Sequence, residues 1–264
     1  MNIGEALFLG LVQGATEFLP ISSSGHLVIT EALLGISEGG LMVEISLHAG
    51  TLLAVLLYFR KRISWMVREG FRSDGDGPQA RSWIFWLIVA TIPAALVGYL
   101  FRDTIEHLFE SPLAALFGLL LTGLILFSTK WSTQRNRRPN GLAGLWMGFA
   151  QALAIIPGIS RSGSTIAIGM WSGVDNADAA EFSFLLSVLA VGGASFMQAL
   201  EISAGSIEPA SGLIVGLLAG LVMAAISGYA AIALLIGILK KRGLVPFAWY
   251  CWAVGAAGIL ILSL

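Results

Sequence analysis

Residues 13–28 read QGATEFLPISSSGHLV, and this stretch determines much of how the chain folds. It gathers a glutamate, three consecutive serines and a histidine around Pro20, in a chain that is otherwise strongly apolar. Proline and glycine interrupt helices, so we expect one helix to end near Pro20 and another to begin by Gly25. Each half spans about a dozen residues, which is too short to cross a bilayer as a helix. The stretch therefore predicts a re-entrant helix–loop–helix hairpin over about 4–34.

The composition of the whole chain indicates an integral membrane protein. Of its 264 residues, 56% are hydrophobic and only 12% are charged, and the mean hydropathy is +0.84. A soluble domain has about 25% charged residues. Six apolar runs are candidates for membrane spans, and they lie at about 45–59, 83–101, 112–129, 181–200, 212–239 and 245–262. We therefore expect an all-α polytopic membrane protein with six transmembrane helices and no nucleic-acid partner.

A second interrupted stretch, over about 142–172, repeats the first. FAQALAIIPGISRSG at 149–163 aligns with LVQGATEFLPISSSG at 11–25, and Gln, Ile, Ser, Ser and Gly recur at matching places. An odd number of predicted spans separates the two copies, so they enter the membrane from opposite sides. This predicts two re-entrant hairpins in a 3+3 inverted-topology repeat, which covers about 1–130 and 140–264 of a single membrane domain. A ligand site is expected near the midplane, where the broken helices meet.

The basic residues predict the orientation of the chain. Under the six-span topology, the loops 60–82, 130–141 and 240–244 fall on one side of the membrane, and they contain all but two of the 15 Lys and Arg residues. Loops rich in Lys and Arg stay in the cytoplasm. We therefore expect these basic loops to be cytoplasmic. The hairpin that contains Glu17 and His26 then enters from the periplasmic, or extracellular, side, and the pocket should open to that side.

Both breaks have side chains that suit an anionic ligand. Each is followed by a serine-rich turn, and the N-terminus of a helix favours a bound anion. Arg161 adds a permanent planar charge suited to phosphate, and a buried arginine needs an anion nearby. A diphosphate fits two such opposed helix ends. The turns contribute these candidate substrate-binding residues: Ser22, Ser24, Ser160, Ser162 and Thr165.

The first break also retains groups that can move protons. Glu17 and His26 correspond to Ile155 and Ser164 in the second copy. A transporter would need only the groups that bind the anion, whereas a hydrolase needs these groups and also groups that move protons. Ser23 could act as a nucleophile with Glu17 or His26 as its base. Direct attack by water, with Glu17 as the base, is the competing route.

Each of these residues could instead have a purely structural role. The serines could cap the second half-helix, Glu17 could serve only as an ion-pair partner of Arg161, and His26 could be a hydrogen-bonded buried histidine. Gln13 and Glu17 lie one helical turn apart on the same face. That face could hold a divalent cation through oxygen ligands.

At these residues the sequence resembles the bacterial undecaprenyl-diphosphate phosphatase family, also called bacitracin-resistance proteins. The resemblance rests on QxxxE at 13–17, FLPISSSGH at 18–26 and PGISRSGST at 157–165, and it extends over essentially the whole chain. It implies hydrolysis of undecaprenyl diphosphate to undecaprenyl phosphate and inorganic phosphate. This reaction would recycle the lipid carrier of peptidoglycan synthesis in the bacterial inner (plasma) membrane and confer bacitracin resistance.

The resemblance also implies roles for particular residues and partners. It gives catalytic positions to Glu17, Ser23, His26 and Arg161, with support from Gln13, Ser160 and Thr165. It implies a divalent cation, magnesium or calcium, for which Gln13 and Glu17 are the candidate ligands, although many relatives have Glu where this chain has Gln13. The expected partners are a polyprenyl diphosphate lipid and membrane lipids, and a homodimer is left open. The alternative function is an inverted-repeat transporter or flippase for a phosphorylated lipid.

Overall fold

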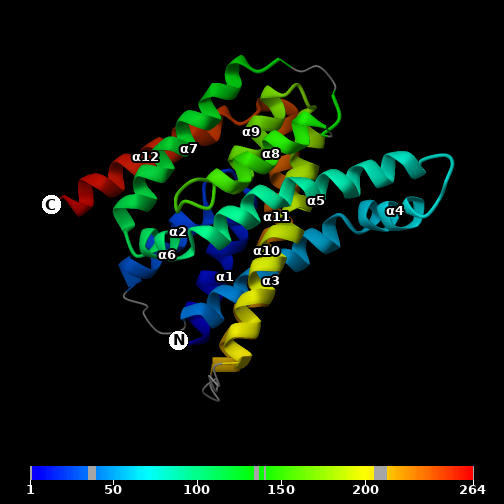
Figure 1. The fold of residues 1–264 in the computed structure, drawn as a ribbon. Helices are drawn as coiled ribbons and strands as arrows, with labels where there is room; N and C mark the ends of the chain where they lie inside the picture. Colours follow the sequence, from blue (N-terminus) through cyan, green and yellow to red (C-terminus); the bar gives the residue numbers. More distant parts are fainter. Residues whose placement is uncertain (1, 35–39, 134–136, 140, 205–212, 264) are drawn as a thin grey trace.

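The computed structural model describes residues 2–34, 40–133, 137–139, 141–204 and 213–263, and these residues are almost entirely helical (Figure 1). The first half contains α1 (Ile3–Phe18), α2 (Ser23–Leu34), α3 (Gly40–Tyr58), α4 (Arg60–Gly70), α5 (Gly77–Leu100), α6 (Arg102–Phe109) and α7 (Pro112–Ser128). The second half contains the 3₁₀ turn η1 (Thr129–Trp131), α8 (Leu142–Leu153), α9 (Arg161–Trp171), α10 (Asn176–Ala204), α11 (Leu213–Arg242) and α12 (Val245–Leu262). The expected all-α fold is confirmed.

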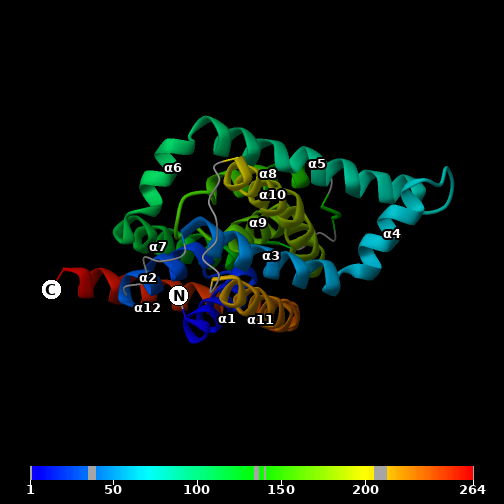
Figure 2. The ribbon, with the colours of Figure 1, turned by 90° about the horizontal axis from the view of Figure 1, so that it is seen from below.

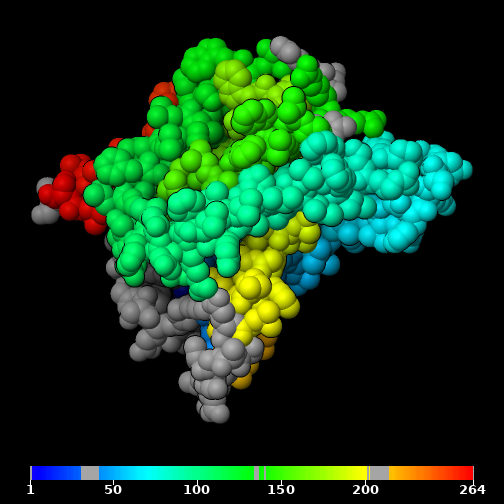
Figure 3. Space-filling model, viewed as in Figure 1, coloured from blue at the N-terminus to red at the C-terminus, as the bar shows by residue number. Residues whose placement is uncertain are grey.

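Several helices are long and apolar enough to cross a membrane. Within the described residues these are α5, α7, α10, α11 and α12, and a sixth candidate is α3 together with α4, which are bent by 68° at Phe59. Their positions coincide with the six predicted spans. Helix α5 also exposes a row of large apolar side chains, and Figure 3 shows this helix running across one face of the molecule. These side chains are Phe85, Ile88, Ile92 and Leu96. The chain is therefore a multi-pass helical membrane protein.

Both predicted helix breaks are present. Helix α1 ends at Phe18 and α2 begins at Ser23, while α8 ends at Leu153 and α9 begins at Arg161. The second break starts three residues earlier than its Pro157 indicates, because the chain already turns at Ala154. Glycine or serine adopts a left-handed conformation in each break, with φ of 83° at Gly158 and 67° at Ser22.

Two short helices lie where the sequence indicated loops. Helix α4 occupies the start of the basic loop 60–82, and α6 occupies the acidic connection after α5. Both are amphipathic, and α4 packs against α5. A search for continuous apolar runs misses such helices, because their charged residues are spread along one face.

The first helix of each half packs against a long helix of the other half. Helix α1 packs against α11 of the other half, and α8 packs against α5 of the other half, as Figure 2 shows with α1 beside α11 along the lower edge. Glycines allow these close contacts. A Cβ atom added at Gly10 would lie 2.4 Å from the Gly220 carbonyl oxygen, and one added at Gly148 would lie 2.4 Å from the Ala90 carbonyl oxygen.

The three basic segments gather around the beginning of α10. Arg62, from the first segment, pairs with Glu181 at 2.6 Å. Arg137, from the second, hydrogen-bonds through its backbone to the turn between α9 and α10. Asn176 donates to the carbonyl of Leu239, which precedes the third segment. The three segments therefore share one end of the molecule.

Candidate active site

The two helix breaks meet in the interior of the protein. The Ser162 hydroxyl, just after the second break, donates to the Leu19 carbonyl of the first break at 3.2 Å. The backbones also approach closely, since a Cβ atom added at Gly25 would lie 3.3 Å from the Gly158 Cα atom. The Leu19 carbonyl freed by the first break is thus paired by a side chain beside the second break, and such pairing is how irregular backbone persists inside a membrane protein.

A buried ion pair joins the breaks. Arg161 Nη2 donates to Glu17 Oε1 at 2.7 Å, and the two side chains are only 13% and 7% exposed. The second arm of the guanidinium, Nη1, donates to the Ser183 carbonyl at 3.2 Å. Removing one member would leave the other charge buried without its partner, at a cost of about 3–5 kcal/mol.

The other oxygen of Glu17 accepts two side-chain hydrogen bonds. Ser23 Oγ donates to Oε2 at 2.5 Å, and Gln13 Nε2 donates to the same atom at 3.1 Å. Ser23 is the first residue of α2, so its hydroxyl lies where the helix N-terminus would face an anion. A hydroxyl bonded to a carboxylate is the arrangement of a nucleophile and its base.

His26 lies one helical turn after Ser23 in α2 but has different partners. Its Nδ1 is 2.8 Å from the Ser22 carbonyl oxygen, and its Nε2 is 2.8 Å from the Tyr250 hydroxyl. Both ring nitrogens are therefore occupied. Of the two bases considered for Ser23, the geometry favours Glu17.

The serines of the two turns cap the helices that follow. Ser22 Oγ accepts from the Gly25 N–H at 3.3 Å and lies 3.2 Å from Ser24 Oγ. In the second copy, Ser160 Oγ accepts from the Gly163 N–H at 3.0 Å. The same cap thus occurs at matching positions, so Ser22 and Ser160 have the capping role that the sequence left open.

Thr165 and Ser162 both connect α9 to its surroundings. The Thr165 hydroxyl is 2.6 Å from the Ser183 hydroxyl of α10, and it also donates to the Arg161 carbonyl at 2.8 Å. Ser162 reaches the first break, as described above. All the predicted site residues therefore lie on the two breaks or the helix turns beside them, and Glu17, Ser23, Gln13 and Arg161 form one connected cluster.

Sequence reasoning missed three residues that support this cluster. Thr122, fully buried in α7, donates to the Gly158 carbonyl and accepts from the Ser160 N–H, both at 2.9 Å. Ser183 and Tyr250 are the other two. Thr122 had a signal, since it is the one hydroxyl between residues 112 and 127 of an otherwise apolar run. Ser183 and Tyr250 had none, because they reach their partners through the packing of α10 and α12 and not through any pattern in the sequence.

The cluster provides few ligands for a cation. Among the residues that the structure describes, no group of three or more His, Cys, Asp or Glu side chains could hold a metal ion. Gln13 Oε1, however, is fully buried and has no hydrogen-bond partner. Together with the Glu17 carboxylate it fits a hard cation that takes its remaining ligands from water and phosphate, as magnesium commonly does.

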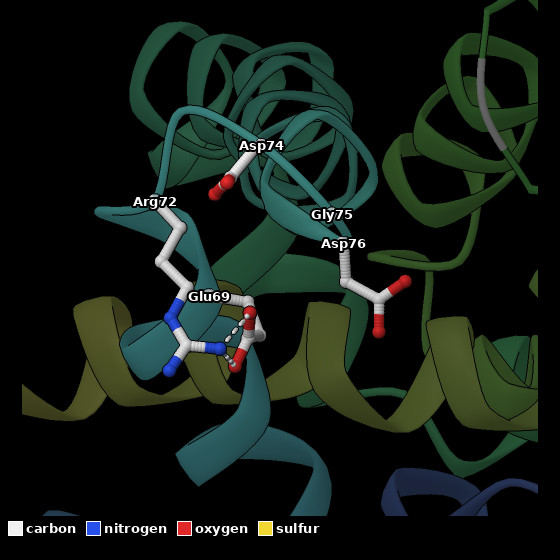
Figure 4. A pocket seen from close by; sticks show the side chains of 5 residues that line it. All are labelled: Glu69, Arg72, Asp74, Gly75 and Asp76. Atoms are coloured by element: carbon white, nitrogen blue, oxygen red, sulfur yellow. Dashed lines mark hydrogen bonds and ion pairs between the residues drawn. The ribbon is translucent and has the colours of Figure 1, made fainter.

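A separate hollow lies at the turn between α4 and α5. Figure 4 shows its lining, in which Arg72 donates to both carboxylate oxygens of Glu69 at 2.9 and 3.0 Å. Asp74, Gly75 and Asp76 complete the lining. It contains no residue of either break, so it is not part of the candidate active site.

The fold and the cluster define an integral membrane protein with a buried polar site suited to an anionic ligand. The family model described as "Bacitracin resistance protein BacA" matches residues 6–257, and the chain belongs to this family. A relative named undecaprenyl-diphosphatase from Syntrophotalea carbinolica is 43% identical over the full length of both chains. Relatives of the same name from Methanobrevibacter smithii and Geobacter sulfurreducens are 41% and 39% identical, and each alignment covers at least 96% of both chains.

Proposed function

We propose that this protein hydrolyses undecaprenyl diphosphate to undecaprenyl phosphate and inorganic phosphate. The observation that carries the proposal is the buried contact of Arg161 and Ser23 with the two oxygens of Glu17. It combines a fixed positive charge with a hydroxyl and its base, which hydrolysis of a phosphate anhydride requires. The names of the full-length relatives support the same substrate. The product would return to peptidoglycan synthesis, and the family name implies bacitracin resistance.

The diphosphate would bind against Arg161 and the N-terminal ends of α2 and α9. A guanidinium has five N–H donors, so phosphate oxygens can bind the group that also contacts Glu17 and Ser183. The prenyl tail would lie between helices, in lipid. Donors that are already fixed in place stabilise charge that develops on the phosphoryl oxygens during the reaction.

In the covalent route, Ser23 Oγ attacks the terminal phosphorus and its proton moves to Glu17 Oε2. The bond between phosphorus and the bridging oxygen breaks, and undecaprenyl phosphate leaves. Water then attacks the phosphoserine, which releases inorganic phosphate and restores the hydroxyl of Ser23. In the competing route, Glu17 activates water, which attacks the terminal phosphorus directly.

Gln13 and Glu17 would hold a magnesium or calcium ion through Oε1 and a carboxylate oxygen. The free, buried Gln13 Oε1 supports this assignment. When bound, the cation supplies additional positive charge next to the phosphoryl oxygens. The two residues themselves orient the nucleophile, because Glu17 accepts from Ser23 and Gln13 donates to the same carboxylate oxygen.

The chain would form a single membrane domain built as a 3+3 inverted repeat, over about 1–130 and 140–264, with both broken stretches as re-entrant hairpins. The packing between the two halves supports this arrangement, because α1 and α8 each contact a long helix of the other half. The matched glycines Gly10 and Gly148 support it further, since each allows the same close approach to a backbone carbonyl.

The basic segments would face the cytoplasm of a bacterial plasma membrane, and the active site would open to the periplasmic or extracellular side. The clustering of all three basic segments around the start of α10 supports this orientation. In Figure 1, α4 lies at the right of the molecule, whereas α6 and the C-terminus lie at the left.

The same packing between the two halves favours one alternative, a transporter or flippase for a phosphorylated lipid. Inverted repeats with broken helices are typical of transporters. Transport of labelled lipid across vesicles, without phosphate release, would distinguish it from the hydrolase. The contact between Ser23 and Glu17 is the feature that transport does not require.

The test is phosphate release from undecaprenyl diphosphate by the protein purified in detergent, with and without divalent cation. We expect turnover by the wild type and its loss in Glu17→Ala and Arg161→Ala. The control is Glu110→Gln, which changes an exposed carboxylate at the C-terminal end of α6 and should keep full activity. A folded wild type that releases no phosphate in either condition would overturn the proposed function.

A further inference from the structure

The contacts of His26 determine which of its nitrogens carries the proton. Nδ1 is 2.8 Å from the Ser22 carbonyl oxygen, which can only accept, so Nδ1 must be the donor. In the neutral imidazole the lone pair is then on Nε2. The hydroxyl 2.8 Å from Nε2 belongs to Tyr250, and it donates to that lone pair.

Tyr250 also fixes the plane of the imidazole. The two rings are nearly parallel, with an interplanar angle of 9° and centroids 5.7 Å apart. Tyr250 comes from α12, 224 residues away in sequence. The next residue, Cys251, is buried and its Sγ lies 3.7 Å from the Pro20 carbonyl oxygen. Two consecutive residues of α12 therefore contact the first hairpin, one at His26 of α2 and one at Pro20 of the break.

We propose that Tyr250 is a positioning residue that holds His26, one helical turn after the nucleophile Ser23 in α2, in a single tautomer with Nε2 as the acceptor. This inference rests on the proposed function and extends it to α12. A hydroxyl both donates and accepts, so Tyr250 remains a partner of Nε2 after His26 takes up a proton. His26 therefore keeps the same two partners, and the same orientation, whether its imidazole is neutral or protonated.

The tautomer itself can be measured. The chain has three histidines, so a sample with ¹⁵N-labelled histidine gives few imidazole signals, and a His26→Gln sample assigns those of His26. In the wild type we expect a protonated Nδ1 and an unprotonated Nε2. Tyr250→Phe keeps the stacked ring and removes the hydroxyl, and it should shift the His26 signals toward a mixture of tautomers. Tyr229→Phe is the matched control, because Tyr229 is equally exposed and packs against Tyr58.

Kinetics on undecaprenyl diphosphate test whether the tautomer matters for the reaction. In Tyr250→Phe we expect kcat to fall by roughly tenfold, short of the 10²–10⁴ that a lost general acid or base costs. KM should stay within about twofold, because Tyr250 acts through His26. Tyr250→Leu, which also removes the stacked ring, should lower kcat further, and Tyr229→Phe should match the wild type.

The outcomes separate this inference from the proposed function. Active wild type with unchanged His26 signals in Tyr250→Phe would overturn the positioning role alone. Altered signals with an unchanged kcat would overturn it as well, because the tautomer would then be irrelevant to turnover. A folded wild type without any turnover would overturn the proposed function, and the role of Tyr250 in that reaction with it.

Discussion

Arg161 donates to Glu17 across 144 residues of sequence, and each of the two charges lies at the helix end that disfavours it. Glu17 lies in the last turn of α1, where the helix dipole is negative, and Arg161 is the first residue of α9, where it is positive. Neither position would be stable for an isolated charge. The contact between these two opposite charges offsets both penalties.

Replacing Arg161 with lysine tests whether the reaction requires the planar guanidinium or only a positive charge. Arg161 uses two nitrogens to reach Glu17 and the Ser183 carbonyl at once, and an ammonium group cannot reproduce this geometry. We expect Arg161→Lys to lower kcat/KM for undecaprenyl diphosphate by about 10²-fold. Arg68→Lys, on the exposed face of α4, serves as the control and should have no effect. A decrease of less than threefold would show that charge alone is sufficient.

The meeting of the two breaks could be predicted from sequence, because it depends on a repeated pattern. Gln13 to Gly25 and Gln151 to Gly163 have the same spacing, and two broken helices in one membrane domain must bury their freed backbone groups against each other. The contact between Arg161 and Glu17 follows from this meeting. The partner of Ser23 was left open between Glu17 and His26, and the choice between them depends on side-chain geometry.

The contributions of α7 and α12 could not be predicted in this way. Thr122 and Tyr250 reach the site only through the tertiary packing of their helices, and no spacing in the sequence relates them to Ser160 or His26. Helix α4 was not predicted for another reason. It begins with three basic residues, RKR at 60–62, and such a run is typical of a loop between membrane spans. Its amphipathic pattern becomes informative only once Met66 is known to be buried.

Ser23→Ala separates the two chemical routes. If Ser23 is the nucleophile, its removal should reduce kcat to the background of the assay, and rapid acid quenching of the wild type should trap phosphate on Ser23. If water attacks directly, Ser23→Ala should retain a measurable fraction of kcat and no phosphoserine should form. Ser263→Ala is the control, because Ser263 lies at the C-terminal end of α12 and its Oγ donates to the Leu260 carbonyl.

Gln13 offers a test of the cation site. Removing divalent cations with a chelator should abolish turnover, and magnesium or calcium should restore it. Gln13→Glu would add a second carboxylate next to Glu17, and we expect it to lower the cation concentration that gives half-maximal activity by about tenfold, through added charge. In the absence of cation the two carboxylates repel each other, so the variant should also unfold at a lower temperature than the wild type. An unchanged cation requirement would rule out Gln13 as a ligand.

Thr122 tests how the second break is held together. Thr122→Val keeps the shape of the side chain but leaves the Ser160 N–H and the Gly158 carbonyl without this buried partner. Each buried polar group that loses its hydrogen-bond partner lowers the free energy of unfolding by about 1–3 kcal/mol. We expect the Tm in detergent to fall by roughly 5 °C or more, whereas Thr122→Ser, which retains the hydroxyl, should lose much less.

The proposed inverted repeat leads to a paired prediction for Gly10 and Gly148. An added methyl group at either position would lie 2.4 Å from a backbone carbonyl oxygen, and main chain cannot move away as a flexible side chain would. We expect Gly10→Ala and Gly148→Ala to lower the free energy of unfolding by similar amounts, about 1–3 kcal/mol each. Both should be measured by thermal unfolding in the same detergent.

Gly237→Ala is the matched control for this pair. Gly237 lies within α11, and a Cβ atom there would have no neighbour within 4 Å, so alanine should be neutral or stabilise the helix by up to about 1 kcal/mol. If the two helix contacts are equivalent, the free energy of unfolding should fall equally in Gly10→Ala and Gly148→Ala and should not fall in Gly237→Ala. A large loss at Gly10 beside a neutral Gly148 would contradict the repeat, because corresponding positions in the two halves would then differ in how closely their helices pack.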